Sequence, residues 1–266
     1  MSNNYDPFEP LPIPFVRASW IRCDAKGLSQ DVVSLTKAAP VQKLDESLTD
    51  LQSVPVGLIS ILHLITVFSH KNWCIAGICD SDGICVELLC TNSAKACADK
   101  FNLRKGIMID ESSAGTCAPS LSVLMRNPCA FNAESHYLKS FRSFDSLAVP
   151  IRNQSVSHIY SLFVFAKYHD PIAKDSVSPY LFAKCLLNKI WQSTQEADNI
   201  SRLVAKLNVL TNREKQVLCF LLMGCKSSEI QKALNINKFT VRDHCRNIYK
   251  KLGKKNRVEL LSLIKT

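Results

Sequence analysis

The feature that most constrains this 266-residue chain is the helical periodicity of its last segment, residues 207–266. One stretch of that segment places apolar side chains on one helical face and basic side chains, at every fourth residue, on another. The apolar residues are Val241, Cys245, Ile248 and Leu252, and the basic residues are Lys238, Arg242, Arg246 and Lys250. Such a helix can pack on a small core while it offers cations to a phosphate backbone, and it fits the major groove of DNA. The segment therefore predicts a small all-α domain that binds double-stranded DNA.

Positive charge is concentrated in the same segment. Residues 207–266 hold 13 of the 33 Lys and Arg residues but only 4 of the 23 Asp and Glu residues. Nearly all of the net charge of +10 thus lies in less than a quarter of the chain. This distribution is expected when one module meets a polyanion. A solvated basic surface without a partner is the alternative that charge alone leaves open.

Helix start and stop signals divide the segment into short helices. Thr211 and Glu214 have the spacing of a capping box. Ser227 can cap a helix over residues 228–234, and Asn237 is placed to cap the basic helix. The stop signals are Gly224 and Gly253, and a last amphipathic helix is expected over residues 256–265.

Residues throughout 207–266 also match the signature of one known family. The matching positions are Leu210, Thr211, Glu214, Leu218, Gly224, Ser228, Glu229, Ile230, Leu234, Ile236, Thr240, Val241, His244, Ile248, Lys251, Leu252 and Arg257. On these residues the segment resembles the LuxR/GerE-type helix-turn-helix. The resemblance implies an all-α domain of four helices, whose last helix often forms a dimer contact.

The resemblance also implies which residues contact DNA. Arg242 and Asp243 would lie toward base edges, because Arg can bond two acceptors of guanine and Asp can accept from cytosine. Lys238, Thr240 and Arg246 would lie near phosphates. The full predicted set is Lys226, Ser227, Lys238, Thr240, Arg242, Asp243, Arg246 and Lys250.

The preceding 206 residues are long enough for one further domain and a connecting helix. The acidic, proline-rich start lacks the pattern of a secretory signal. The apolar stretch 54–68 is too short to cross a bilayer, so we expect a cytoplasmic protein without a membrane partner. The predicted division is an N-terminal extension (1–40), a sensor domain (41–170), a connecting helix (171–206) and the DNA-binding domain (207–266).

The sensor region alternates between helix and strand patterns. Strands are expected at 73–80 and 83–90, joined by a tight turn at Asp80–Gly83, and again at 128–132, 147–153 and 158–166. Helices are expected at 56–69, 93–101 and 115–126. This order predicts an α+β domain with an antiparallel sheet.

Short motifs in this region support a second resemblance. They are RASWIRCDAKGL at 17–28, Asp80 to Gly83, Gly106, Glu111 with Gly115 and Thr116, His136 with Tyr137, and Ala148 to Ile151. On these motifs the region resembles the GAF sensor domain of the acetoin- and glycerol-catabolism activators. The resemblance implies a pocket for an unknown small-molecule effector between the sheet and residues 104–146. The candidate pocket residues are Asp110, Glu111, Thr116, Cys117, His136, Tyr137 and Phe144.

The connecting helix has apolar residues near coiled-coil spacing. They are Phe182, Leu186, Ile190, Ile200, Leu203 and Leu207. A coiled coil here would hold a homodimer together and set the separation of two recognition helices, about 34 Å for adjacent half-sites. A passive linker helix is the alternative.

The 12 cysteines admit more than one role. No CxxC pair occurs, and strand alternation sends neighbouring cysteines of residues 74–90 to opposite sheet faces, so no metal site is predicted. Most of these thiols are expected to fill the core as small apolar groups. Redox sensing stays open, as do a bound iron–sulfur cluster or haem and a redox enzyme that uses Cys117 or Cys129.

These observations favour a transcriptional regulator rather than an enzyme. We expect a homodimer that binds DNA, contacts RNA polymerase and responds through its GAF-like domain to a small molecule or a redox signal. A first domain that binds only another protein is the remaining alternative.

Overall fold

The computed structural model describes Phe8 and residues 11–53, 57–69, 72–152, 159–167, 179–194, 209–222 and 226–262. Its centre is a five-stranded sheet with the order β2-β1-β5-β4-β3, in which every neighbouring pair is antiparallel. The strands are β1 (Cys74–Cys79), β2 (Cys85–Cys90), β3 (Cys129–Phe131), β4 (Asp145–Arg152) and β5 (Ile159–Ala166). The prediction of an α+β fold with an antiparallel sheet is confirmed.

The β1–β2 turn forms as its sequence indicates. The Asp80 carboxylate accepts hydrogen bonds from the backbone N–H groups of Asp82 (2.9 Å) and Ile84 (2.8 Å). Gly83 has φ of +83°, which favours glycine. Asp80 is also held by the Ser47 hydroxyl at 2.5 Å. The Asp80 side chain thereby closes the turn by accepting hydrogen bonds from two backbone N–H groups.

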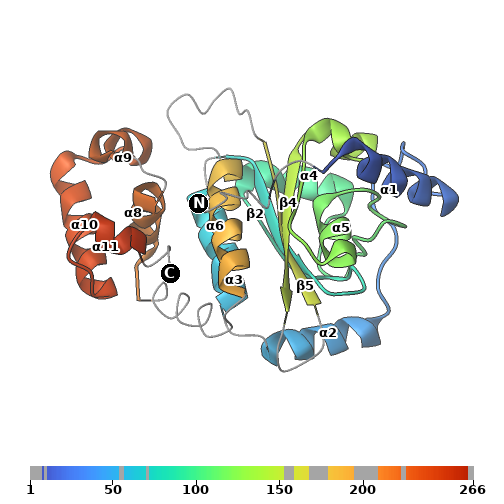
Figure 1. Ribbon diagram of the computed structural model, residues 1–266, viewed down its shortest axis with the longest axis horizontal. Coiled ribbons are helices and arrows are strands. Elements are labelled where there is room, and N and C mark those ends of the chain that lie inside the picture. Colours follow the sequence, from blue (N-terminus) through green and yellow to red (C-terminus); the bar gives the residue numbers. More distant parts are fainter. Residues whose placement is uncertain are drawn as a thin grey trace, which may run out of the picture.

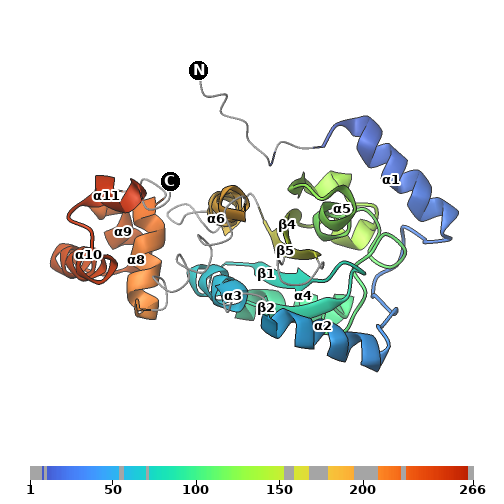
Figure 2. The same ribbon diagram turned by 60° about the horizontal axis from the view of Figure 1, so that its bottom comes forward.

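Alternation along the strands gives the sheet two buried faces. On β5, Leu162 and Val164 face one apolar cluster, whereas Phe163 and Phe165 face the other. The first face is covered by α3 (Gly57–Phe68) and α6 (Pro179–Thr194), and the second by α4 (Asn92–Phe101) and α5 (Ala118–Met125) (Figures 1 and 2). The helices expected at 56–69, 93–101 and 115–126 correspond to α3, α4 and α5.

Two helices of the N-terminal part are not predicted. Helix α1 (Ile13–Ala25) lies over the α5 side of the sheet, and α2 (Val41–Ser53) packs beside β2 (Figure 1). Several apolar residues of α1 face solvent, among them Ile13, Phe15 and Ile21. Because these residues are not on the buried face, α1 has no clear amphipathic pattern from which it could be recognised.

The coiled-coil expectation is wrong for the first half of the connecting segment. Leu186 and Ile190 are buried within this chain, where α6 packs on β4 and β5. Side chains that fill the sensor core cannot also form a seam with a second chain. Ile200, Leu203 and Leu207 lie outside the described residues.

The C-terminal segment folds into short helices whose buried apolar side chains form one cluster with those of α3 and α6. These are α8 (Asn212–Leu222), α9 (Ser227–Leu234), α10 (Lys238–Leu252) and α11 (Arg257–Ser262). The unit lies at one end of the molecule and α1 at the other, and α8 contacts α3 of the sensor (Figures 1 and 2).

The predicted helix ends are largely correct. Thr211 and Glu214 form the capping box, Asn237 caps α10 through the backbone N–H of Thr240 at 2.8 Å, and Gly253 ends α10 with φ of +64°. The prediction for Ser227 is wrong, because it is the first residue of α9 and Lys226 takes the capping position. Gly224 lies outside the described residues. Within the described part of the chain, no helix has the length and apolar character that crossing a bilayer requires.

Candidate functional site

Helix α10 separates its apolar residues from its charged ones. Val241, Ile248 and Leu252 are buried in the domain core. The charged residues Lys238, Arg242, Asp243, Arg246 and Lys250 are all exposed. The Arg246 side chain is 78% exposed and forms an ion pair with Asp243 at 3.4 Å. The outward face of α10 is therefore a solvated surface of mainly positive charge.

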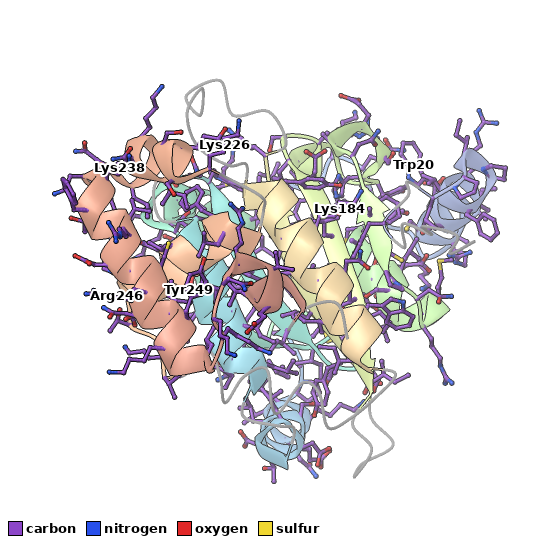
Figure 3. All side chains as sticks on the ribbon, turned by 60° about the vertical axis from the view of Figure 1, so that its left-hand side comes forward. Trp20, Lys184, Lys226, Lys238, Arg246 and Tyr249 are labelled. Carbon is purple, nitrogen blue, oxygen red and sulfur yellow. The ribbon has the colours of Figure 1, made fainter. Side chains whose placement is uncertain are left out.

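This charged face lies away from the sensor. Helix α10 forms the outer edge of the C-terminal unit, with α8 between it and the sheet (Figures 1 and 2). The side chains of Lys238 and Arg246 extend outward from that edge, whereas Tyr249 lies toward the interior (Figure 3). Nothing in the described part of the chain covers the face.

The remaining residues of the predicted DNA-contacting set lie beside this face. Lys226 and Ser227 are exposed at the amino end of α9, where backbone N–H groups point outward. Thr240 is half-buried, and its hydroxyl donates to the Asn237 side chain at 3.0 Å. Seven of the eight predicted residues are thus exposed, and the hydroxyl of the half-buried Thr240 is partly committed to the cap.

Charge-assisted contacts join α8 to each of the other three helices of the unit. Glu214 on α8 is 3% exposed and accepts from Lys251 Nζ at 2.7 Å and from the backbone N–H of Thr211 at 2.7 Å. Arg213 donates to the backbone oxygen of Leu234, at the end of α9. Arg257 donates to the backbone oxygen of Leu221, at 2.8 Å. The residues concerned, apart from Arg213 and Leu221, belong to the family signature, but their spacing alone does not reveal which pairs meet.

The ionisation of Glu214 follows from these contacts. Burial opposes ionisation of this carboxyl, but hydrogen bonds from Lys251 and Thr211 outweigh it and lower its pKa. The carboxylate is therefore charged at neutral pH and joins the start of α8 to the end of α10.

Comparison with known proteins identifies the family of the C-terminal segment. Residues 208–264 match the family model for bacterial regulatory proteins of the luxR family. The C-terminal segment is a LuxR-type helix-turn-helix domain. The predicted resemblance to this family is confirmed for the C-terminal segment.

Curated relatives match mainly through the LuxR-type domain. The CsgBAC operon transcriptional regulatory protein of Escherichia coli is 41% identical over 54 residues, which is 20% of this chain and 25% of that protein. The transcriptional activator protein SolR of Ralstonia solanacearum is 30% identical over 101 residues, which is 38% of this chain and 43% of that protein. The chain thus spans between a quarter and less than half of the length of these relatives. Both relatives are regulators of transcription.

The N-terminal region has a fold counterpart among solved structures. The E. coli DhaR(N)–DhaL complex matches with a TM-score of 0.50 and 16% identity, over 74% of this chain and 66% of that one. At this identity the likeness shows the fold alone. The fold expected from the resemblance to the GAF sensor domain of the acetoin- and glycerol-catabolism activators is thereby confirmed.

The predicted sensor residues come together on the second face of the sheet. Thr116, Cys117, His136, Tyr137 and Phe144 are all buried. The Phe144 ring lies 5.1 Å from Trp73, 5.2 Å from Phe141 and 5.0 Å from Phe165, between ring centres. These distances are those of packed aromatic rings. The five residues therefore form part of the core in this conformation.

His136 is a neutral member of this core. Its Nε2 lies 2.8 Å from the Ser146 hydroxyl and its Nδ1 lies 3.1 Å from the backbone oxygen of Ala133. Burial, and to a lesser degree the charge of Arg142, lowers the pKa of His136 to about 4. The imidazole is therefore uncharged at neutral pH.

Helix α1 closes over the same region through a buried carboxylate. Glu111 is 6% exposed and accepts from Ser19 Oγ at 2.5 Å, Arg22 Nε at 3.0 Å and Arg22 Nη2 at 2.6 Å. Lys26 adds an ion pair at 3.6 Å. Burial opposes ionisation of Glu111, but the bonds from Arg22 and Ser19 outweigh it and lower the pKa of this carboxyl. The sequence offers no signal that Glu111 binds α1.

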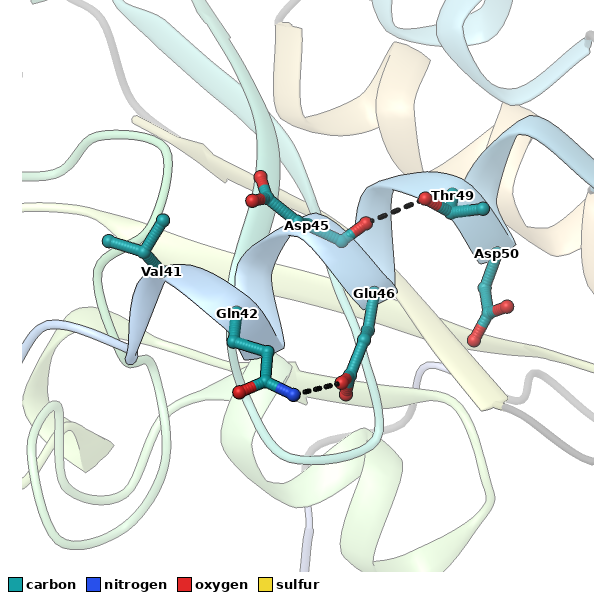
Figure 4. Close-up of a pocket in the computed structure, with 6 residues that line it drawn as sticks. All are labelled: Val41, Gln42, Asp45, Glu46, Thr49 and Asp50. Atoms are coloured by element: carbon teal, nitrogen blue, oxygen red, sulfur yellow. Dashed lines mark hydrogen bonds between the residues drawn. The ribbon is translucent and has the colours of Figure 1, made fainter.

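The cavities at this end of the molecule are small or open. A pocket of about 160 Å³ borders Asp110, Glu111 and Lys26, but not Thr116, Cys117, His136, Tyr137 or Phe144. A larger surface pocket of about 670 Å³ follows α2 (Figure 4). It is lined by Val41, Gln42, Asp45, Glu46, Thr49 and Asp50 and borders no predicted sensor residue. The sensor pocket thus stays a prediction, with two of its seven residues at the small cavity.

The buried thiols are poor nucleophiles. Burial raises the pKa values of Cys117 and Cys129 to about 12, well above their usual range. Among the described residues, no group of three or more His, Cys, Asp or Glu side chains is arranged to hold a metal ion. Cys117 and Cys129 pack as apolar core residues in this conformation.

Because buried His136 is neutral, we expect the folded chain to lose stability as the pH falls. Its pKa is about 4 in the folded chain and about 6.5 when unfolded. As the pH falls from 7.5 to 4, the unfolded chain takes up a proton that the folded chain does not, so the free energy of unfolding decreases by roughly 3 kcal/mol from this group. Urea unfolding of the wild type and of His136→Asn, measured at several pH values, checks this. Identical pH profiles for the two proteins would contradict it.

The Glu111 contacts predict that α1 is held mainly by one carboxylate. Glu111→Gln should weaken the bonds from Arg22 and Ser19 and speed tryptic cleavage within α1 roughly five- to thirtyfold, as expected for a loss of about 1–2 kcal/mol in a local opening equilibrium. Asp31→Asn is the control, because it removes an exposed ion pair with Lys139. Cleavage of α1 at the wild-type rate in Glu111→Gln would show that other contacts hold the helix.

Proposed function

We propose that this chain is a cytoplasmic transcriptional regulator that binds double-stranded DNA as a homodimer and whose N-terminal region receives the signal. The observation that carries the proposal is the exposed basic face of α10, on a LuxR-type domain and turned away from the sensor. A recognition helix presented in this way can enter the major groove without displacement of the sensor. Contact with RNA polymerase would convert occupancy of DNA into a change in transcription.

The dimer contact is proposed for the surface of α11. Val258 on this helix is 77% exposed, whereas Leu260 is buried in the domain core. An apolar residue at this position would be covered by the same helix of a second chain related by a two-fold axis. Such a dimer places two recognition helices side by side, as two-fold half-sites require.

The signal proposed for the sensor is a small molecule that binds near Asp110 and Glu111. This is where the predicted residues border a cavity, and where Arg22 on α1 forms hydrogen bonds and an ion pair with Glu111. A ligand that competes for Glu111 would release α1. A redox signal has less support, because the buried thiols have raised pKa values.

A protein signal is the second candidate. The cavity beside the predicted residues is only about 160 Å³, below the usual range of ligand pockets, which is about 300–1,000 Å³. DhaR(N), which shares this fold, was solved in complex with the protein DhaL. A partner protein could therefore act on the outer surface of the sensor.

The DNA-binding proposal is tested with two matched variants of α10. Arg242→Ala should relax preference at one base pair, at a cost of about 1–3 kcal/mol on the preferred sequence. Lys250→Ala should weaken all sequences alike and reduce the salt slope by about one unit. Selection of random DNA followed by titration at several salt concentrations separates the two. Equal effects of both changes on every sequence would contradict the role of Arg242.

A further inference from the structure

An aromatic side chain stands on the charged face of α10. Phe239, the second residue of the helix, is 73% exposed. It precedes Asp243, Arg246 and Lys250 by four, seven and eleven residues, so helical spacing places all four on one stripe. Val241 and Ile248 are buried on the opposite side. Phe239 therefore points away from the domain core, in line with the charges that would meet DNA.

Exposure alone would not single out this residue. Other large apolar residues of the described chain are exposed, including Ile13 and Val258, and single exposed apolar residues are common in proteins. Phe239 differs because its neighbours on the stripe are charged. A phenyl ring cannot bond a phosphate, and an exposed polar residue would serve the solubility of this face better.

The major groove offers one apolar group to such a ring. Each thymine carries a C5-methyl group in the groove, and apolar side chains recognise it by contact. The residues near the amino end of a recognition helix are those that reach base edges in helix-turn-helix proteins. Phe239 lies in the first turn of α10. From this geometry we infer that Phe239 determines sequence specificity by contact with a thymine methyl group, an inference that rests on the proposed DNA binding.

The test removes the methyl group without any other change in the DNA. Each thymine of a site selected by the full chain is replaced in turn by deoxyuridine, and binding is measured by fluorescence anisotropy. At one thymine of each half-site, the wild type should lose about three- to tenfold in affinity, the loss expected when one methyl group is no longer buried. Phe239→Ala should bind the thymine and deoxyuridine forms equally, and Phe239→Met should keep most of the preference.

Phe15→Ala is the matched control, because it truncates another exposed phenylalanine, on α1 at the other end of the molecule. It should keep the wild-type preference for thymine. The inference is overturned if no thymine matters to the wild type, or if Phe239→Ala keeps the same preference. Failure to select any DNA would overturn the proposed function together with this inference, whereas selection without a thymine effect would overturn the inference alone.

Discussion

Phe144→Ala is expected to lower the free energy of unfolding by about 3–5 kcal/mol. The ring is buried and packs against Trp73, Phe141 and Phe165, with His136 and Phe101 also within 6.0 Å between ring centres. Truncation removes the apolar surface that these rings bury and leaves a cavity that their fixed positions cannot fill. Urea unfolding followed by circular dichroism measures the change.

The control for this variant is Phe15→Ala. Phe15 lies on α1 and is 56% exposed, so its truncation should change stability by no more than about 0.5 kcal/mol. The sequence placed Phe144 among the residues of a ligand pocket. Unchanged stability of Phe144→Ala, with loss of the response to an effector, would favour that pocket and contradict the packing described above.

Glu214→Ala should destabilise the LuxR-type domain by about 2 kcal/mol. The variant removes the cap on Thr211 and the contact with Lys251, both at 2.7 Å, from a carboxylate that is almost fully buried. The Lys251 side chain is 36% exposed and can regain water, so its part of the loss is small. Hydrogen exchange of the amides of α8 and α10 should quicken roughly thirtyfold, since 1.4 kcal/mol corresponds to a factor of ten.

Glu229→Ala is the matched control for Glu214. Glu229 is also a capping-box carboxylate, but it is exposed and its recorded bond is to the backbone N–H of Lys226. Its loss should cost no more than about 1 kcal/mol and should affect α9 first. Equal exchange rates across the domain in the two variants would show that burial of Glu214 and its bond to Lys251 contribute nothing.

The C-terminal domain could be predicted closely because its signals are local. The spacing of Val241, Ile248 and Leu252 fixes the buried face of α10, and the caps at Asn237 and Gly253 fix its ends. The pairing of Glu214 with Lys251 could not be predicted from such local signals. It depends on how α8 crosses α10, which no periodicity within either helix specifies.

The strands of the sensor region could be predicted from the sequence, but the way in which helices pack over its sheet could not. Alternation and turn residues are enough to place both hairpins, since each hairpin is formed by neighbours in the sequence. Helix α1 binds through Ser19 and Arg22 to Glu111, about ninety residues away, and this contact leaves no periodic pattern. The apolar spacing of α6 cannot distinguish a seam between chains from burial against the sheet, because both give the same pattern.

The measurement that tests the account most directly is selection of genomic DNA fragments by the full chain, in parallel with a variant that reverses Lys238, Arg246 and Lys250 to Glu. These side chains are exposed, so the variant should keep the fold and the thermal stability of the wild type. If the outward face of α10 binds DNA, the wild type enriches a two-fold symmetric site and the variant enriches none. Enrichment of the same fragments by both proteins, or of no fragment by the wild type, would contradict DNA binding through the outward face of α10.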